Sequence, residues 1–301
     1  HTYLYLLGYK YTKNDKINKG MPPIEEFKNI PYRLREIGDP PEKLFIQGNF
    51  PDEEMKFLTV VGSRKHTSYG KTVCEKLIEK LKGYPIVIVS GMALGIDAIA
   101  HESALRAGLT TVAVPGSGLS PKVLYPKANF ALSKRILESG GCLLSEFPAD
   151  FEATKWSFIK RNRIMAGLSD AVLLIEAEEK SGTLTTARLA SDYNREVLVI
   201  PGNITSPTSR GTNELLFYGA TPVTKSSDIL EALGLTPKEQ VEVATNLTNE
   251  EKLIFDTLRE PLLKEELAIL LQKPINEINI AVTMLEIKGV IRQSNGKIER
   301  A

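Results

Sequence analysis

Short apolar runs alternate with amphipathic stretches along most of the chain, from Phe57 onward. Six of the runs are almost wholly apolar: FLTVVG, IVIVSG, TTVAVPG, CLLSEF, AVLLIEA and EVLVIPG. The stretches between them, such as YGKTVCEKLIEKLKG and IDAIAHESALRAG, have the spacing of amphipathic helices. Fully apolar strands that alternate with helices are typical of a parallel sheet covered on both faces. The pattern therefore predicts a doubly wound α/β domain with a mostly parallel sheet.

The same pattern divides the chain into four segments. Residues 1–50 are interpreted as a proline-punctuated lead-in or the remnant of a truncated helical domain, and residues 51–235 as the α/β domain. Residues 236–246 form a polar linker. Residues 247–301 begin with a Thr248-x-x-Glu251 capping box, contain three helical stretches and end near an Asn295-Gly296 hairpin signal. That order predicts a small winged-helix domain.

The third helical stretch of this small domain, INEINIAVTMLEIKG, contains one Lys and two Glu. A helix that reads DNA in the major groove is normally basic. We therefore interpret the C-terminal domain as a protein-binding or dimer-supporting module rather than a DNA reader.

Composition limits the classes of function. The 38 Lys and Arg residues nearly balance the 37 Asp and Glu residues, so any anion site must come from local clustering. No apolar run approaches the roughly 20 residues of a membrane helix, and no signal-like segment opens the chain. The two cysteines, Cys74 and Cys142, lack partners at metal-binding spacing and are interpreted as buried thiols. We expect a cytoplasmic protein without membrane contact.

Glycine-rich turns follow several of the predicted strands. In a parallel sheet these turns share one edge, where glycine lets the backbone approach a ligand and helix N-termini offer free N–H groups. The glycines are Gly62, Gly91, Gly95, Gly116, Gly118 and Gly182, with Ser63, Ser90, Ser117, Ser181 and Thr183 among them. The sequence lacks G-x-G-x-x-G and G-x-x-x-x-G-K-[ST], which disfavours simple NAD binding and a P-loop ATPase. The turns predict a crevice that binds phosphate.

Cationic and aromatic residues gather at two of these turns. Arg64, Lys65 and His66 follow the first glycine turn, and Lys155, Lys160, Arg161 and Arg163 are expected in the turn before AVLLIEA. Trp156 and Phe158 lie among the second set. Cations together with exposed aromatics are typical of single-stranded nucleic-acid binding. The alternative is structural: Arg161 and Arg163 would pair with Asp170 or Glu176, and Trp156 would lie in the core.

Catalytic interpretations have less support. Asp97 and His101 share a helix face, but helix capping by Asp97 explains the pair better than a metal site does. Ser145 and Glu146 end a predicted strand without forming a nucleophile–base pair. We expect no catalytic residue, no metal and no cofactor.

A series of motifs between Pro31 and Asp228 resembles the DNA-processing protein A family, also called DprA or Smf. In order, the series includes YRLREIGDPPEKLFIQGN, VGSRKHTSYG, SGMALGIDAIAHESAL, TTVAVPGSGL, RNRIMAGLSDAVLLIEA, SGTLTTARLA and GTNELLFYGATPV. The resemblance implies an extended Rossmann-type domain that binds single-stranded DNA and loads a RecA-type recombinase in natural transformation, without an enzymatic cycle. The binding residues that it implies are Gly62, Ser63, Arg64, Lys155 and Phe158, together with the backbone of Ser181, Gly182 and Thr183.

The resemblance also implies a homodimer formed through GTNELLFYGATPV. Leu215, Leu216 and Phe217 are consecutive apolar residues on a predicted helix, so at least one should point outward. The patch could also overlap the recombinase contact. We therefore expect a two-fold, self-complementary interface at these residues.

The alternative function is that of a nucleotide-processing enzyme. The predicted sheet also resembles relatives with a PGGxGTxxE loop, which cleave the bond between base and ribose of a nucleotide. The corresponding region here is PGNITSPTSRGTNE, in which an insertion separates PG from GT and Glu214 follows Thr212 too closely. A nucleotide sensor without catalysis is a third possibility.

Overall fold

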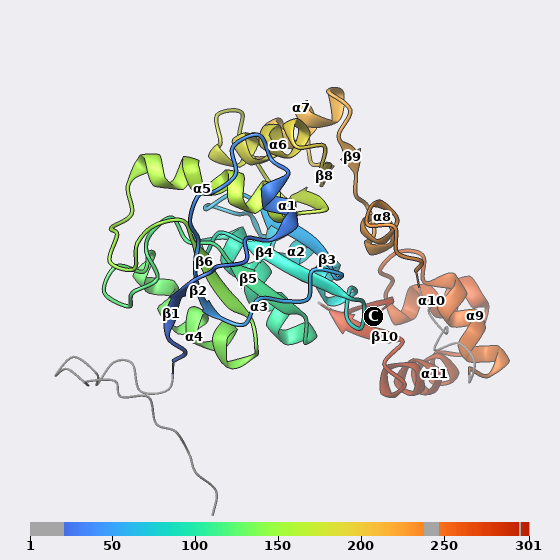
Figure 1. Cartoon of the computed structure of the whole chain (residues 1–301). Helices are drawn as coiled ribbons and strands as arrows, with labels where there is room; N and C mark the ends of the chain where they lie inside the picture. The colour runs from blue at the N-terminus through green and yellow to red at the C-terminus, as the bar shows by residue number, and fades with distance from the viewer. Residues whose placement is uncertain (1–20, 238–246, 295, 301) are drawn as a thin grey trace, which may run out of the picture. The chain divides into compact units, whose positions relative to one another are not determined.

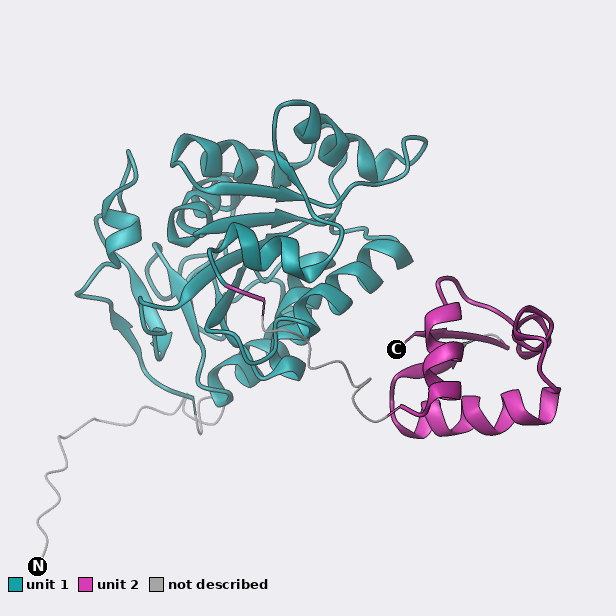
Figure 2. Cartoon of the chain, turned by 90° about the vertical axis from the view of Figure 1, so that its right-hand side faces the viewer, with its two compact units in different colours: residues 1–235 teal, residues 236–301 magenta. Residues whose placement is uncertain are grey.

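The computed structural model describes residues 21–237, 247–294 and 296–300 (Figure 1). The chain divides into two compact units between Leu235 and Thr236, drawn in separate colours in Figure 2. Each unit has a hydrophobic core of its own.

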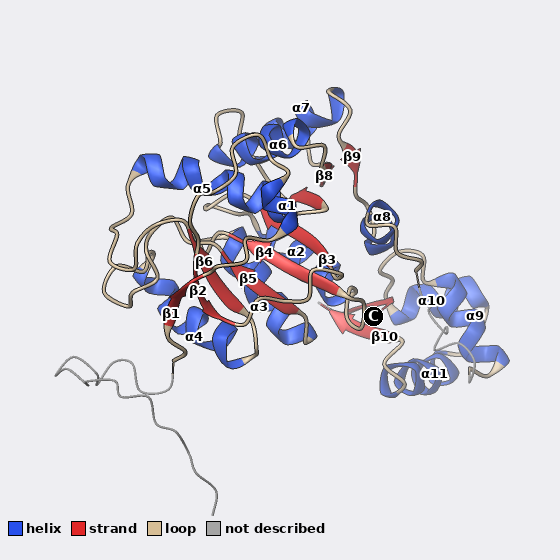
Figure 3. Cartoon of the chain, viewed as in Figure 1, coloured by secondary structure: helices blue, strands red, loops and turns tan. Residues whose placement is uncertain are grey.

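The first unit is built on a nine-stranded sheet with the order β1-β2-β6-β5-β4-β3-β7-β8-β9 (Figure 3). Seven strands are parallel: β3 (Lys56–Val61), β4 (Ile86–Ser90), β5 (Thr110–Ala113), β6 (Cys142–Ser145), β7 (Ala171–Leu174), β8 (Glu196–Val199) and β9 (Thr221–Pro222). The six predicted strands are β3 to β8, so the predicted doubly wound, mostly parallel fold is confirmed.

Helices cover both faces of this sheet, because the side chains of each central strand alternate between two cores. On β3, Phe57 and Val61 enter the core beneath α5 and α6, whereas Leu58 and Val60 enter the core beneath α2 and α3. The helices are α1 (Tyr32–Arg35), α2 (Ser68–Glu79), α3 (Ile96–Ala107), α4 (Phe130–Glu138), α5 (Lys155–Leu168), α6 (Gly182–Asp192), α7 (Arg210–Phe217) and α8 (Ser226–Ala232), with short 3-10 turns η1 (Lys127–Asn129) and η2 (Pro207–Ser209).

The direction of the strand order reverses at β3. On one side lie β4, β5 and β6, and on the other lie β7, β8 and β9. The register pairs Val61 with Leu174, so β3 and β7 end side by side at the same edge of the sheet. In doubly wound sheets, the crevice at such a switch point is the usual ligand site. The fold therefore places a binding crevice between the segments that follow β3 and β7.

The described part of the lead-in joins the first unit. Strand β1 (Ile24–Glu26) pairs with β2 (Phe45–Gly48), which pairs antiparallel with β6. Between them, α1 carries the buried Arg33, which forms an ion pair of 3.1 Å with Asp170 and lies 4.8 Å from the centroid of the Phe57 ring. Residues 21–48 thereby extend and cover the sheet, while residues 1–20 lie outside the described part.

The second unit contains three helices and a hairpin. They are α9 (Asn249–Thr257), α10 (Lys264–Leu271), α11 (Ile275–Ile287), β10 (Ile291–Ser294) and β11 (Lys297–Arg300). The predicted capping box is confirmed, since the Glu251 backbone N–H donates to Thr248 Oγ1 over 3.3 Å and the Thr248 N–H donates to Glu251 over 2.7 Å. Asn295, part of the predicted hairpin turn, lies outside the described residues. The winged-helix assignment stays a prediction.

Two further expectations from the sequence concern the cysteines, expected to be buried thiols, and the absence of a membrane helix. Cys74 and Cys142 are free and buried, and burial raises the pKa of both thiols. Within the described part of the chain, no helix has both the length and the apolar character needed to cross a membrane.

Candidate functional site

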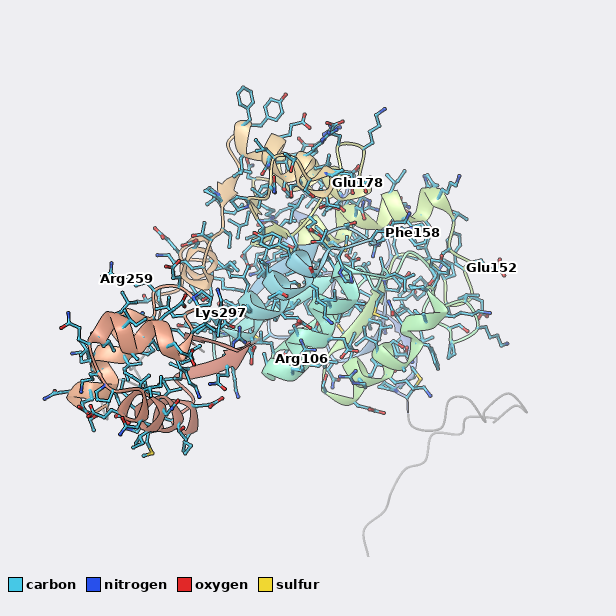
Figure 4. All side chains as sticks on the ribbon, turned by 180° about the vertical axis from the view of Figure 1, so that it is seen from behind. Arg106, Glu152, Phe158, Glu178, Arg259 and Lys297 are labelled. Carbon is cyan, nitrogen blue, oxygen red and sulfur yellow. The ribbon has the colours of Figure 1, made fainter. Side chains whose placement is uncertain are left out.

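A pocket of about 590 Å³ opens at the switch point between β3 and β7. Its walls are the turn after β3, the first turns of α5 and the start of α6, and we call it the switch-point pocket. Figure 4 labels two of its residues, Phe158 of α5 and Glu178 of the segment after β7. All but two of the predicted binding residues line it: Gly62, Ser63, Arg64, Lys65, Lys155, Phe158, Arg161, Ser181, Gly182 and Thr183. The exceptions are Trp156 and Arg163, and two further members of the cationic cluster, His66 and Lys160, do not line it either.

The first wall is the turn after β3, which is held tightly against the start of α3. A Cβ at Gly62 would lie 2.7 Å from Ile96, so only glycine fits there without displacement. The Ile96 N–H donates to the Ser63 carbonyl over 3.2 Å, and the Lys65 N–H donates to Ser63 Oγ over 3.0 Å. The turn is thereby fixed by its backbone, and Arg64 and Lys65 are left exposed.

The second wall is the N-terminal part of α5. A capping box of Thr154 and Ser157 starts this helix at Lys155, and Ser157 also donates to the Gly116 carbonyl over 2.6 Å. The expectation that Lys155, Lys160, Arg161 and Arg163 lie in a turn is therefore wrong, because all four lie on a 14-residue helix. A serine at the third helical position, where Glu or Gln is usual, makes this start signal weak in the sequence.

Two of the predicted cationic and aromatic residues meet across the pocket. The Arg64 guanidinium, from the turn after β3, lies 5.4 Å from the centroid of the Phe158 ring on α5. Phe158 itself packs over Gly116, where a Cβ would collide with the ring. Lys155 is exposed one turn before Phe158. Segments almost a hundred residues apart in the sequence thus present two cations beside one aromatic ring.

The third wall is the N-terminus of α6. Ser181 caps this helix by accepting from the Thr183 N–H over 3.2 Å, and Thr183 Oγ1 donates to the Gly62 carbonyl over 3.3 Å. The second bond ties the start of α6 to the turn after β3. A helix N-terminus carries a partial positive charge and unpaired N–H groups, both of which favour an anion.

Arg161 forms the floor of the pocket and is 5% exposed. Its guanidinium donates to the Gly91 carbonyl over 2.6 Å and to the Val114 carbonyl. Burial lowers the pKa of Arg161 to about 10, against the opposing effect of Asp97, so it remains charged at neutral pH. Burial raises the pKa of Asp97, and Arg161 is the largest of the influences that lower it. Arg161 therefore adds positive charge to the pocket while its donors hold the strand ends together.

Arg163 and Trp156 lie on the other flank of α5. Arg163 forms ion pairs with Glu146 and, over 3.3 Å, with Asp39. The predicted alternative, pairing of Arg161 and Arg163 with Asp170 or Glu176, is wrong. Asp170 is paired with Arg33, and Glu176 accepts hydrogen bonds from Thr67.

Trp156 is 58% exposed, so its alternative placement in the core is also wrong. Trp156 and Arg163 both line a second pocket, of about 750 Å³, which we call the α5 side pocket. The sequence alone does not place Trp156 and Phe158 on different flanks, because that requires knowing that the helix already begins at Lys155.

Sequence reasoning missed several residues of the switch-point pocket. Asn162, Thr186 and Glu178 line it, and the Asn162 amide donates to the Gly182 carbonyl over 3.4 Å. A helix starting at Lys155 would have placed Asn162 one turn after Phe158, on the same flank. Glu178 is exposed and gave no signal in the sequence.

The described residues do not assemble a catalytic group. His101 is buried with its Nδ1 2.7 Å from Thr111 Oγ1, and burial lowers its pKa to about 3. Ser145 donates to the Ser117 carbonyl over 2.7 Å, and Glu146 is paired with Arg163. Asp97 accepts from the Ala93 N–H over 3.4 Å, but the N-cap of α3 is Gly95 and no side chain caps it, so the expectation that Asp97 caps this helix is wrong. Within the described ranges, His, Cys, Asp and Glu form no group of three able to hold a metal ion.

The predicted dimer residues lie on α7. Leu215 and Leu216 are half-buried and pack against the core beneath α5 and α6. Phe217 is 85% exposed and contacts Tyr218, which is 72% exposed. The expectation that at least one of the three apolar residues points outward is confirmed for Phe217.

Comparisons with known proteins identify relatives of the first unit. The profile of a family described as DNA recombination-mediator protein A matches residues 24–234. The chain is 40% identical over 213 residues to Protein Smf of Escherichia coli, covering 71% of this chain and 56% of that protein. It is 42% identical over 200 residues to DNA processing protein DprA of Streptococcus pneumoniae, covering 66% of this chain and 70% of that protein.

Solved structures of two relatives share the fold. DNA processing protein A from S. pneumoniae superposes with a TM-score of 0.64 at 39% identity, covering 69% of this chain and 73% of that chain. DNA processing protein A from Helicobacter pylori, whose structure is described as showing a single-stranded DNA binding mode, has a TM-score of 0.64 at 34% identity, covering 70% and 96%.

Proposed function

The chain belongs to the DNA recombination-mediator protein A family, and from that premise we propose that it binds single-stranded DNA in the switch-point pocket. The observation that carries the proposal is the meeting of Arg64, Lys155 and Phe158 at the end of β3. Two cations and a helix N-terminus suit consecutive phosphates, and an aromatic ring between them suits a base.

The geometry favours a single strand over a duplex. The phosphate donors and the Phe158 ring lie in the same pocket, so a ligand must present a phosphate and the face of a base together. In a duplex the base faces are stacked and paired, and exposing one costs a few kcal/mol. The related H. pylori protein, whose structure concerns single-stranded DNA binding, supports the same choice.

We propose further that the bound strand is protected and then passed to a RecA-type recombinase in natural transformation and recombination. The family's description as a recombination mediator supports this role. The chain spans about half the length of the E. coli relative, 56%, so the proposal concerns the segment that the two share. A partner of this kind works on chromosomal and incoming DNA, which is the reason that we propose a cytoplasmic location.

We propose that binding proceeds without catalysis. The alternative is an enzyme that cleaves the bond between base and ribose of a nucleotide, in a pocket of the same fold. Asp97 and Arg161 are the acidic and basic residues that such an enzyme would have at the pocket floor. The guanidinium of Arg161 already donates to backbone carbonyls, which gives it a structural role. Incubation with nucleoside monophosphates should release no free base; release that depends on Asp97 would favour the enzyme.

The protein is expected to bind a labelled single-stranded oligonucleotide more tightly than a duplex of the same sequence. Fluorescence anisotropy at several salt concentrations measures both affinities. Because phosphate contacts release counterions, the single-strand affinity should fall steadily as salt rises. Equal affinity for duplex, or no response to salt, would contradict the proposal.

Phe217→Glu is expected to convert a homodimer into a monomer, measured by sedimentation velocity. We propose a two-fold interface at the outward face of α7, where Phe217 is largely exposed and Leu215 and Leu216 anchor the helix to the core. A charge at Phe217 would be buried in such an interface without a partner, which opposes association.

Leu94→Glu provides the matched comparison for this prediction. Leu94 is an apolar side chain of the first unit that precedes α3 and is 49% exposed. Its replacement should leave the dimer intact. Dissociation caused by Leu94→Glu as well, or a wild-type protein that sediments as a monomer at micromolar concentration, would contradict the α7 interface.

A further inference from the structure

Helix α5 separates two pockets, and its flanks carry different residues. Lys155 and Phe158 line the switch-point pocket, whereas Trp156 and Lys160 line the α5 side pocket on the other flank. Ile159 lines both, so the pockets adjoin at this residue. Ile159 is 60% exposed, so it presents an accessible apolar surface where the two pockets adjoin.

The α5 side pocket has no excess of positive charge. Its charged residues are three acids and three bases: Asp39, Glu42 and Glu146 against Lys43, Lys160 and Arg163. Glu146 accepts from Arg163 and lies 3.3 Å from the Lys160 ammonium, and Asp39 pairs with Arg163. These pairs use two of the three cations that a phosphate would need, Lys160 and Arg163. The pocket is therefore a poor phosphate site.

The same pocket has a preformed aromatic wall. Trp156 is 58% exposed, yet its ring is held in place from two directions. The Phe147 ring packs edge-on at 5.9 Å between centroids, and the Lys160 ammonium lies over the indole ring, 5.2 Å from its centroid. The aliphatic side chains of Ile159 and Leu189 complete the wall. A flat, uncharged ring system would cover this apolar surface and stack on the indole.

We propose that the α5 side pocket holds a nucleobase of the same strand whose phosphates occupy the switch-point pocket. The inference rests on the proposed function and deepens it. The strand crosses α5 over Ile159, and a helix with its side chains is only about 10–12 Å wide, so a few nucleotides reach across. The two pockets bind different parts of the strand: phosphates lie beside Arg64 and Lys155, and a base stacks on Trp156. Stacking accepts any base, so the site adds affinity with little sequence preference.

Trp156 is the only tryptophan in the chain, which makes its fluorescence a direct report on this pocket. A base that stacks on the indole is expected to quench the emission, with the same half-saturation as the anisotropy of a labelled oligonucleotide. The probe is a single-stranded DNA long enough to enter both pockets. An oligonucleotide of equal length with abasic sites keeps the phosphates and should bind without quenching.

Trp156→Ala should weaken binding of the intact oligonucleotide roughly 5- to 150-fold, the loss expected for one stacked base. Trp156→Phe keeps a ring and should restore most of that affinity. Trp156→Ala removes no phosphate contact, so the affinity of this variant should fall with rising salt as steeply as that of the wild type. For the abasic oligonucleotide, Trp156→Ala should bind as the wild type does, because the base that the indole contacts is missing.

The outcomes separate this inference from the proposed function. The side-pocket site would be contradicted by salt-dependent binding with unchanged Trp156 emission and wild-type affinity in Trp156→Ala. That result would still agree with phosphate binding in the switch-point pocket. Quenching by the abasic strand would also overturn it, since no base would then be required. If anisotropy shows no binding of single-stranded DNA, both the proposed function and the side-pocket site are contradicted.

Discussion

Arg161→Met is expected to lower the free energy of unfolding by about 3–5 kcal/mol, the range for a change that leaves a buried charge uncompensated. Arg161 is 5% exposed and joins the ends of two strands by donating to the Gly91 and Val114 carbonyls. Its loss would leave those carbonyls without this donor and would remove the stronger of the two guanidinium charges that stabilise the buried Asp97 carboxylate. Urea unfolding followed by far-UV circular dichroism measures the change.

Lys160→Met is the matched control for Arg161→Met. Lys160 precedes Arg161 on α5 and is half-buried, and its ion pair with Glu146 is shared with Arg163. Its replacement should cost less than about 1 kcal/mol, as for most partly exposed ion pairs. A similar small loss for Arg161→Met would show that the guanidinium is not a structural link at the pocket floor.

The double replacement of Arg64 and Lys155 by alanine is expected to weaken single-strand binding by about a hundredfold or more. A hydrogen bond to a charged group contributes about 1.5–3 kcal/mol, and two such contacts are removed. Both side chains are exposed, so the fold should be retained. The control is Lys80→Ala with Lys82→Ala, which removes two exposed cations at the far end of α2 and should leave binding unchanged.

The sheet could be predicted because its central strands are buried on both faces. Such strands are continuous apolar runs, and each of the six runs proved to be a strand. The edge where the turns meet follows from the parallel arrangement, so Gly62, Arg64 and Ser181 could be placed together without knowing any contact. Phe158 joined them because aromatic and cationic residues cluster in the same stretch.

The partners of the arginines could not be predicted, because they are distant in the sequence. Arg163 contacts Asp39 across 124 residues, and Arg161 contacts Gly91 across 70. Hydrophobic periodicity gives no information on such pairs. Placing Trp156 on a flank of α5 requires knowing that the helix begins at Lys155. The Thr154–Ser157 capping box that starts it is an unusual signal.

The salt dependence of the Arg64 and Lys155 double variant tests most directly whether the switch-point pocket binds phosphates. For single strands, the logarithm of the affinity falls with the logarithm of the salt concentration, with a slope of about −0.7 for each phosphate neutralised. Removal of both cations should reduce the steepness of that slope by about 1.4, whereas the Lys80 and Lys82 control should keep the wild-type slope. A double variant that binds with the wild-type slope would contradict the assignment of this pocket as the phosphate site.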